Sequence, residues 1–233
     1  MSKRQFKIDG KECSAEAGQF VIDAAAENGV YIPSLCHMKG VCAAGSCRIC
    51  TVKFNGANVA ACTAILPETG DVNIESNTPE LTAMRKMIVE LLFVEGNHFC
   101  PSCEKSGNCE LQALAYRFQM LVPEFSYNFP LRNVDATSPK IYLDRNRCIQ
   151  CKRCIRTIKD DKGRSCFAFY KRGHKLQINI DHEIAGKMND EQALKAMQAC
   201  PVGAIIKKEI GFAIPIGKRK FDKVAIGSDI EKK

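Results

Sequence analysis

Twelve of the fourteen cysteines of this 233-residue chain fall in three groups, and each group has the spacing of an iron–sulfur ligand set. Cysteine thiolates hold the iron of such clusters, with four protein ligands for each [2Fe–2S] or [4Fe–4S] core. Cluster cofactors carry electrons one at a time, and the protein supplies their binding and environment. Three ligand sets in so short a chain therefore predict a protein devoted to electron transfer.

The first group contains two alternative ligand sets that differ in one cysteine. One reading is Cys36-x10-Cys47-x2-Cys50-x11-Cys62. The other begins with Cys42, because Cys42-x4-Cys47-x2-Cys50 has the plant-type [2Fe–2S] spacing. Only one of Cys36 and Cys42 can be the fourth ligand, and spacing alone does not choose between them.

The second group has three cysteines and needs one more donor. Cys100-x2-Cys103-x5-Cys109 supplies three thiolates, and His98 lies two residues before the first of them. We expect His98 to complete this set. A neutral imidazole in place of a thiolate makes a cluster less negative, which raises its reduction potential.

The third group has the spacing of a bacterial-type [4Fe–4S] site. Cys148-x2-Cys151-x2-Cys154 is followed much later by Cys200-Pro201. Since the chain has only one such triplet, Cys200 is expected to complete the same cluster. Zinc is the competing metal, but zinc sites favour paired Cys-x2-Cys knuckles over a triplet. Disulfides are disfavoured because nothing indicates a secreted protein.

Hydrophobic periodicity indicates the elements that position these ligands, and together they predict an α+β fold. Strands are expected at 4–8, 51–54, 59–61, 72–74, 141–143 and 176–180, with a hairpin turn at Asn55-Gly56. Helices are expected at 19–28, 78–96, 109–121 and 190–199. The first strands and helix predict a small, mostly antiparallel sheet crossed by one helix. Residues from Gly211 onward show little periodicity and predict an extended arm.

The ligand groups divide the chain into small modules, which often need a metal staple to be stable. We expect a [2Fe–2S] domain at 1–77, a helical [4Fe–4S] domain with one histidine and three cysteine ligands at 78–122, a linker at 123–138, a ferredoxin-type [4Fe–4S] domain at 139–210 and a tail at 211–233. Cys13 and Cys166 are left over and are expected to be buried structural cysteines. His37, His174 and His182 are expected to be structural or exposed.

Charge and hydrophobicity constrain location and partners. The charged start Met-Ser-Lys-Arg has no apolar segment after it, and no apolar run is long enough to span a bilayer. We therefore expect a cytoplasmic protein without membrane contact. The net charge of +8 includes pairs such as Lys152-Arg153 and Lys207-Lys208. These are interpreted either as solvated surface or as docking sites for acidic subunits, and no nucleic-acid-binding pattern accompanies them.

The chain resembles a known family over essentially its whole length. Residues 8–11, 32–37, 44–50 and 100–112, with the third cysteine group, resemble the N-terminal part of the large iron–sulfur subunit of respiratory complex I. A long molybdopterin-oxidoreductase-like domain follows in that subunit and is absent from this sequence. The length and the segments 214–217 and 226–231 resemble the small iron–sulfur diaphorase subunits of cytoplasmic NAD-reducing [NiFe] hydrogenases.

This resemblance implies a complete ligand assignment. It implies a β-grasp domain whose [2Fe–2S] cluster is held by Cys36, Cys47, Cys50 and Cys62, which makes Cys42 a non-ligand. It implies two [4Fe–4S] clusters, one held by His98, Cys100, Cys103 and Cys109, and one by Cys148, Cys151, Cys154 and Cys200. His98 departs from the family pattern, in which the histidine usually lies four residues before the first cysteine.

The resemblance also implies a role. The expected function is electron transfer in the diaphorase part of an NAD-reducing [NiFe] hydrogenase. The expected partners are an FMN- and NAD-binding diaphorase subunit and the small and large hydrogenase subunits. The chain has neither G-x-G-x-x-G nor a P-loop, so no nucleotide site and no catalytic residue are expected in it. Alternatives are the equivalent subunit of an NAD-dependent formate dehydrogenase or [FeFe] hydrogenase complex, and a free-standing multi-cluster ferredoxin.

Overall fold

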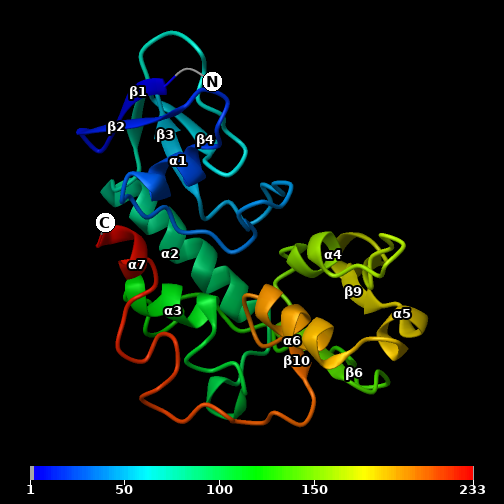
Figure 1. Ribbon diagram of the computed structural model, residues 1–233. Coiled ribbons are helices and arrows are strands. Elements are labelled where there is room, and N and C mark those ends of the chain that lie inside the picture. Colours follow the sequence, from blue (N-terminus) through cyan, green and yellow to red (C-terminus); the bar gives the residue numbers. More distant parts are fainter. Residues whose placement is uncertain (1–2, 233) are drawn as a thin grey trace.

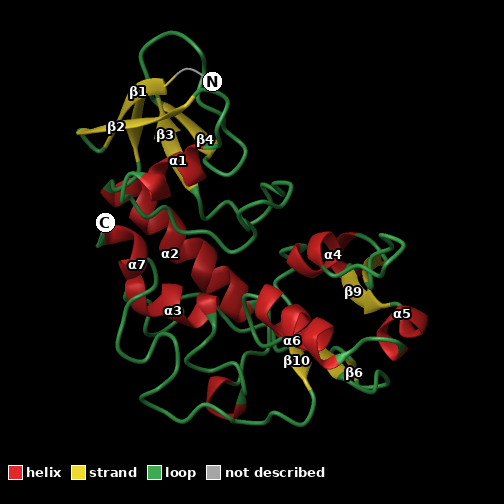
Figure 2. Cartoon of the chain, in the orientation of Figure 1, coloured by secondary structure: helices red, strands yellow, loops and turns green. Residues whose placement is uncertain are grey.

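The computed structural model describes residues 3–232 and has a sheet domain at one end (Figure 1). A long helix runs from this sheet toward the middle of the molecule, and a second α+β unit lies at its far end (Figure 2). The C-terminal tail returns along the middle region and ends close to the start of the long helix. The α+β fold expected from the sequence is therefore confirmed.

The N-terminal domain is a five-stranded sheet with the strand order β2-β1-β5-β3-β4. Its elements are β1 (Lys3–Ile8), β2 (Lys11–Glu16), α1 (Val21–Glu27), β3 (Thr51–Phe54), β4 (Ala57–Ala60) and β5 (Asn73–Glu75). β1 and β5 are parallel and the other pairs are antiparallel. Asn55 and Gly56 both have positive φ, 46° and 84°, as a two-residue hairpin turn of this kind requires. The expected sheet and hairpin are confirmed.

The middle region is helical. α2 (Pro79–Val94) begins at Thr78, whose hydroxyl accepts a hydrogen bond from the Leu81 amide at 3.2 Å, and it has proline in its first turn. A short 3₁₀ turn, η1 (Cys100–Ser102), is followed by α3 (Glu110–Arg117).

α3 is shorter than the helix expected at 109–121. Gln119 has a φ of 52°, and the amides of Gln119 and Met120 bond back to the carbonyls of Tyr116 and Ala115. These two bonds form a Schellman motif, which satisfies the last carbonyls and ends the helix. The usual sequence signal, a glycine at the left-handed position, is missing here because glutamine occupies it.

The C-terminal unit contains two small sheets. β10 (Ile205–Lys207), β7 (Ile141–Asp144) and β6 (Val134–Asp135) form one, and β8 (Phe167–Tyr170) pairs with β9 (Gln177–Ile180) in the other. The helices are η2 (Arg145–Arg147), α4 (Arg153–Thr157), η3 (Gly173–Lys175), α5 (His182–Gly186) and α6 (Asp190–Ala199). The strands near 141–143 and 176–180 and the helix 190–199 are confirmed. β6 falls within the segment 123–138 that the sequence predicts to be a linker.

The tail differs from the extended arm that the sequence predicts. It makes specific contacts along its course and ends in a short helix, α7 (Ser228–Glu231). The Phe221 amide bonds to the Gly107 carbonyl at 2.9 Å, and Arg117 of α3 donates to the Ile226 carbonyl at 2.8 Å. The tail therefore packs against both the second ligand segment and α3.

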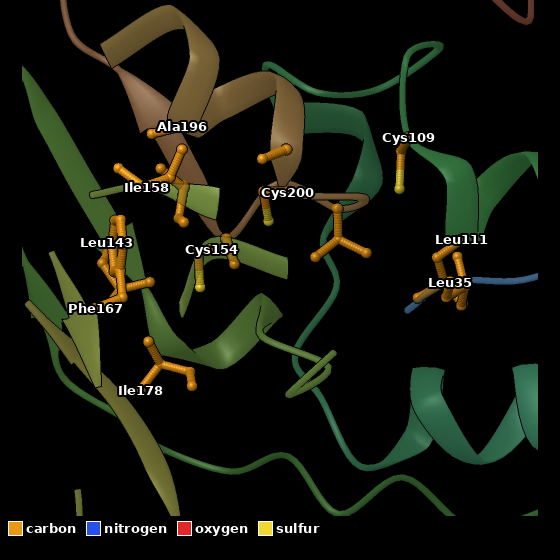
Figure 3. Packing of buried hydrophobic residues seen from close by; sticks show 14 of the residues in the cluster. Leu35, Cys109, Leu111, Leu143, Cys154, Ile158, Phe167, Ile178, Ala196 and Cys200 are labelled. Atoms are coloured by element: carbon orange, nitrogen blue, oxygen red, sulfur yellow. The ribbon is translucent and has the colours of Figure 1, made fainter. Parts of the chain in front are cut away.

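Two hydrophobic cores organise the molecule. One lies inside the N-terminal sheet domain, between its strands and α1. The other spans the middle and C-terminal regions and also includes Leu35 and Ile49 from the loops of the first ligand set. Figure 3 shows Leu35 beside Leu111 of α3, and Cys154 and Cys200 among the apolar residues of the same core. The loop residues Leu35 and Ile49 thus pack with the second and third ligand segments, whereas Cys50 and Cys62 of the first set belong to the core of the sheet domain. Among residues 3–232, none of the helices is both long enough and apolar enough to span a bilayer.

Candidate iron–sulfur sites

The first site brings together four cysteines from the long loop between α1 and β3 and from the end of a hairpin. Cys36 follows α1, Cys47 and Cys50 lie on the loop before β3, and Cys62 follows β4. Hydrogen bonds between their thiols join Cys36 to Cys47 and Cys62, and Cys62 to Cys50. Cys42 is exposed, and its thiol faces the carbonyl of Ala43. The structure therefore places together the set containing Cys36 and leaves Cys42 outside.

The chemistry of this set suits a cationic core. Hydrogen bonds from Cys47 and then Cys62 lower the pKa of Cys36, whereas the hydrogen bond to Cys36 is the foremost cause that raises the pKa of Cys62. Buried thiolates at such short range repel one another, so without a metal they must share protons. A metal core would replace those protons and neutralise the thiolates, which is how metal binding is coupled to thiol ionisation.

A buried arginine supports the same loop from behind. Arg85 of α2 is only 3% exposed, and its guanidinium donates to the carbonyls of Ile49, Thr51 and Ser76 at 3.0, 2.8 and 2.7 Å. Burial lowers its pKa, and the Cys50 sulfur is the foremost charge acting against this effect. Arg85 thus fixes the loop between Cys47 and β3 and places a positive charge next to the ligand set.

The second site surrounds a small cavity at the end of α2. Its lining includes His98, Cys100, Cys103 and Cys109 together with Phe93 and Gly203. The sulfur of Cys109, at the N-cap of α3, accepts from the Gln112 amide at 3.5 Å. Despite its short spacing from Cys100, His98 thus lies on the same cavity as the three cysteines.

Two features of this cavity fit a bound cluster. The Nε2 atom of His98 is buried without a hydrogen-bond partner, and burial lowers the pKa of the imidazole to about 4, which keeps it neutral and able to ligate. A Cβ on Gly203 would lie 2.4 Å from the Cys103 sulfur, so only glycine leaves room there. Among residues 3–232, no group of three or more His, Cys, Asp or Glu side chains has an arrangement that could hold a single metal ion.

The third site joins the turn before α4 to the end of α6. Cys151, Cys154 and Cys200 are buried and Cys148 is partly exposed. Burial raises the pKa of Cys148 to about 11 and of Cys151 to about 12, and the charge on Cys200 acts on both. The four cysteines therefore lie close enough together to act on one another's charges, and three of them are buried.

The backbone of this turn directs amides toward the sulfurs. Gln150 and Lys152 have left-handed φ values of 53° and 64°, which wind the chain tightly between successive cysteines. The amides of Gln150, Arg153 and Ile155 face the sulfurs of Cys148, Cys151 and Cys154. Donors of this kind stabilise thiolates and help set a cluster's potential. All twelve predicted ligands thus fall into three groups that fit iron–sulfur cores.

Arginines connect the three groups, and sequence reasoning did not identify them. Arg156 of α4 donates to the carbonyls of Cys36 and Cys151 at 2.5 and 3.5 Å, and also to that of Cys42, so it joins the first site to the third. Arg147 approaches the Cys103 sulfur at 3.6 Å. Their place in the sequence could have indicated them, because Arg147 and Arg153 each directly precede a cysteine of the third group.

One charge interpretation is wrong. The sequence suggests that Lys152-Arg153 belongs to a solvated or docking surface, but Arg153 is 6% exposed and forms a bidentate ion pair with Glu110. The charge of Arg153 is therefore neutralised by a buried carboxylate beside the third cysteine group and does not face solvent. The remaining residues behave as expected: Cys13 and Cys166 are buried, His174 is exposed, and His37 and His182 pair with Asp23 and Asp135.

Comparison with protein-family models matches three stretches that together make up most of the chain. Residues 3–78 match a 2Fe-2S iron–sulfur cluster binding domain. Residues 85–122 match the NADH-ubiquinone oxidoreductase-G iron–sulfur binding region, and residues 138–206 match the ferredoxin-like domain of NADH-quinone oxidoreductase subunit 3. The fold and these matches define an iron–sulfur protein with one [2Fe–2S] domain and two [4Fe–4S]-type domains.

Relatives and solved structures narrow the class. The chain is 50% identical over 219 residues to the gamma subunit of the NAD-reducing hydrogenase HoxS of Cupriavidus necator, covering 94% of this chain and 93% of that one. A crystal structure of an NAD+-reducing [NiFe]-hydrogenase contains a chain with a TM-score of 0.85 and 39% identity, covering 94% and 93%. The chain belongs to the family of gamma subunits of NAD-reducing hydrogenases.

More distant relatives are much longer proteins. The alpha subunit of the NADPH-Fe(3+) oxidoreductase of Geobacter sulfurreducens is 30% identical over 88% of this chain, which spans 24% of that protein. The mitochondrial NADH-ubiquinone oxidoreductase 78 kDa subunit of Candida albicans is 29% identical over 99% of this chain, which spans 33% of it. The resemblance to complex I is therefore confirmed for a segment of the longer subunits.

Proposed function

We propose that this chain is the electron-transfer subunit of the diaphorase part of an NAD-reducing [NiFe] hydrogenase. The observation that carries this proposal is the end-to-end match to the Cupriavidus necator subunit, together with the three four-donor groups. The relatives of other activity match only through a quarter to a third of their own lengths, which favours the hydrogenase assignment over them.

The ligands we propose are those that the structure groups. Cys36, Cys47, Cys50 and Cys62 would hold a [2Fe–2S] cluster, and His98 with Cys100, Cys103 and Cys109 a [4Fe–4S] cluster. Cys148, Cys151, Cys154 and Cys200 would hold the other [4Fe–4S] cluster. Bound clusters of this kind supply reversible one-electron oxidation and reduction. The chain's own residues would hold these clusters and keep water away from them.

The contacts between sites support a continuous relay. Arg156 joins the first site to the third through the carbonyls of Cys36 and Cys151. The amide of Glu110, next to Cys109, bonds to the carbonyl of Pro201, next to Cys200, at 2.8 Å. The third site therefore contacts both of the others, as a chain of redox centres in one path requires.

The reacting molecules are assigned to partners. We propose that an FMN-containing subunit binds NAD, that the hydrogenase small and large subunits react with H2, and that the complex works in the cytoplasm. The sequence carries no dinucleotide or phosphate-binding motif, which supports this division. The same division leaves this chain without catalytic residues of its own.

Dye-linked partial reactions test whether this chain carries electrons between the hydrogenase subunits and the flavin subunit. The complex is purified anaerobically through a tag on this chain, and flavin and nickel are measured. H2-dependent dye reduction reports the hydrogenase subunits, and NADH-dependent dye reduction reports the flavin subunit. With Cys154→Ser, H2-dependent NAD+ reduction should fall at least about tenfold while both dye reactions persist.

The matched control is Cys166→Ser, a buried cysteine of the same module outside the ligand groups. It should retain the coupled reaction. Purification of the chain without flavin or nickel would contradict the proposal. So would coupled activity that survives Cys154→Ser with the cluster signal lost.

A further inference from the structure

A single arginine spans the boundary between the second and third ligand groups. Arg147 ends η2 and directly precedes Cys148 of the third group. Its side chain nevertheless points into the second group, where one terminal nitrogen lies 3.6 Å from the Cys103 sulfur and 3.5 Å from the Gly203 carbonyl. Arg147 also lines the cavity shared by His98 and the three cysteines.

The surroundings hold this guanidinium in place. Its Nε lies 3.1 Å from a carboxylate oxygen of Asp144, and the nitrogen facing Cys103 is 3.6 Å from Glu104. Glu104 is itself fixed, because the Tyr142 hydroxyl donates to it at 2.7 Å. With its terminal nitrogen 3.6 Å from the Cys103 sulfur, the arginine is a close hydrogen-bond donor to that sulfur.

We propose that Arg147, supplied by the third module, donates a charge-assisted hydrogen bond to the ligand sulfur of Cys103 and so raises the reduction potential of the histidine-ligated cluster. This inference rests on the ligand set proposed above. It gives one module control over the potential of its neighbour's site, and it acts in the same direction as the neutral His98 ligand.

The direction follows from charge. Reduction adds one electron to the site and breaks no bond in the protein. A nearby positive donor stabilises the more negative, reduced form, and arginine keeps its proton in proteins. Because the reduced and oxidised sites differ by one charge, we expect loss of the bond to change the equilibrium constant for reduction about tenfold, which for one electron is about 59 mV.

Redox titration of the full chain tests this inference. The chain is labelled with 15N-histidine, its clusters are reconstituted anaerobically, and low-temperature EPR follows each signal against potential. Pulsed EPR identifies the histidine-ligated cluster by its coupling to the label. Arg147→Gln should lower the reduction potential of that signal by about 59 mV, which corresponds to a tenfold change in the equilibrium constant for reduction. The potential of the [2Fe–2S] signal should not change. Arg147→Lys, which keeps the charge, should recover part of the difference.

Glu104→Gln gives an independent arm with the opposite sign. It removes a negative charge beside Cys103 while its amide oxygen can still accept from Tyr142, so the potential of the same signal should rise. The control is Arg164→Gln, which removes an exposed arginine paired with Asp160. This control should move no potential.

The outcomes separate the two proposals. A wild-type chain that lacks three cluster signals, or lacks coupling to the labelled histidine, overturns the proposed ligand assignment and this inference with it. Three wild-type signals with the histidine-ligated potential unmoved in Arg147→Gln overturn the inference alone. If the Arg147→Gln chain does not take up the cluster, the test is the reduction potential of the histidine-ligated signal in Glu104→Gln. An unchanged or lowered potential in that variant overturns the inference.

Discussion

Arg153 and Glu110 form a bidentate ion pair in which both nitrogen–oxygen distances are 2.8 Å. Glu110 follows Cys109 directly and Arg153 directly precedes Cys154, and both cysteines are proposed ligands. The pair therefore fastens the second ligand group to the third at residues adjacent to ligands. It is mostly buried, so its geometry fixes how the two modules sit against each other.

Removing the carboxylate should loosen this junction. In Glu110→Gln the buried guanidinium of Arg153 loses its charge partner, and we expect a loss of about 2 kcal/mol in stability. The measurement is the urea concentration at which the visible absorbance of the clusters disappears. The control is Glu183→Gln, which breaks an exposed pair with Lys187 and should shift that midpoint little. Equal midpoints for the two variants would show that the buried pair does not hold the junction.

Cys36 and Cys42 should behave oppositely. Cys36→Ala removes a thiol that contacts Cys47 and Cys62, so we expect the [2Fe–2S] signal to be lost and the iron content to fall from about ten to about eight. Cys42→Ala removes an exposed thiol and should leave both unchanged. Iron analysis and EPR of the reduced chain measure this. Loss of the signal in Cys42→Ala with retention in Cys36→Ala would reverse the assignment.

His98 should affect one cluster only. His98→Ala removes the donor whose Nε2 lacks a partner in the cavity, and one [4Fe–4S] signal should change or disappear. His98→Cys should restore a cluster with a lower potential, because a thiolate adds negative charge. His174→Ala, at an exposed histidine, is the control. An unchanged spectrum in His98→Ala would remove this residue from the ligand set.

The tail should depend on glycine at position 227. Gly227 has a φ of 92°, and a Cβ there would lie 2.3 Å from the ring of Tyr31. Gly217 has a similar φ of 90° but open space around its Cα, so Gly217→Ala measures the backbone strain alone. Gly227→Ala should cost about 1–3 kcal/mol more, from the added clash.

Trypsin cleavage after Lys223 measures the difference. When a segment opens and closes rapidly, the cleavage rate follows the population of the open form. We therefore expect cleavage about tenfold faster in Gly227→Ala than in Gly217→Ala. Similar rates in the two variants would show that contact with Tyr31 does not hold the tail.

The proposed ligands could be picked out from the sequence because cluster chemistry is local. Cys148, Cys151 and Cys154 must lie on one tight turn, and that constraint is visible as spacing. The α6 boundaries were found equally well, since Asn189 and Gln192 form a capping box at its start. By contrast, spacing could not decide between Cys36 and Cys42, because loop length is flexible and the choice depends on how the loop folds.

The connecting arginines could not be predicted in the same way. The partners of Arg85 lie up to 36 residues away, and those of Arg156 up to 120, so no local pattern records them. A charged side chain ordinarily indicates solvent exposure, whereas carbonyls of packed loops accept hydrogen bonds from these two guanidiniums. The course of the tail was missed for a similar reason, since isolated contacts such as Phe221 to Gly107 leave no periodicity in the sequence.

The central claim is that this chain holds one [2Fe–2S] and two [4Fe–4S] clusters. Iron analysis combined with quantitative low-temperature EPR of the anaerobically reduced chain tests it most directly. The ligand arithmetic predicts about ten irons per chain, one [2Fe–2S] signal and two [4Fe–4S] signals, each integrating to about one spin. A fully loaded chain with fewer than three cluster signals, or with zinc in place of iron, would contradict the account.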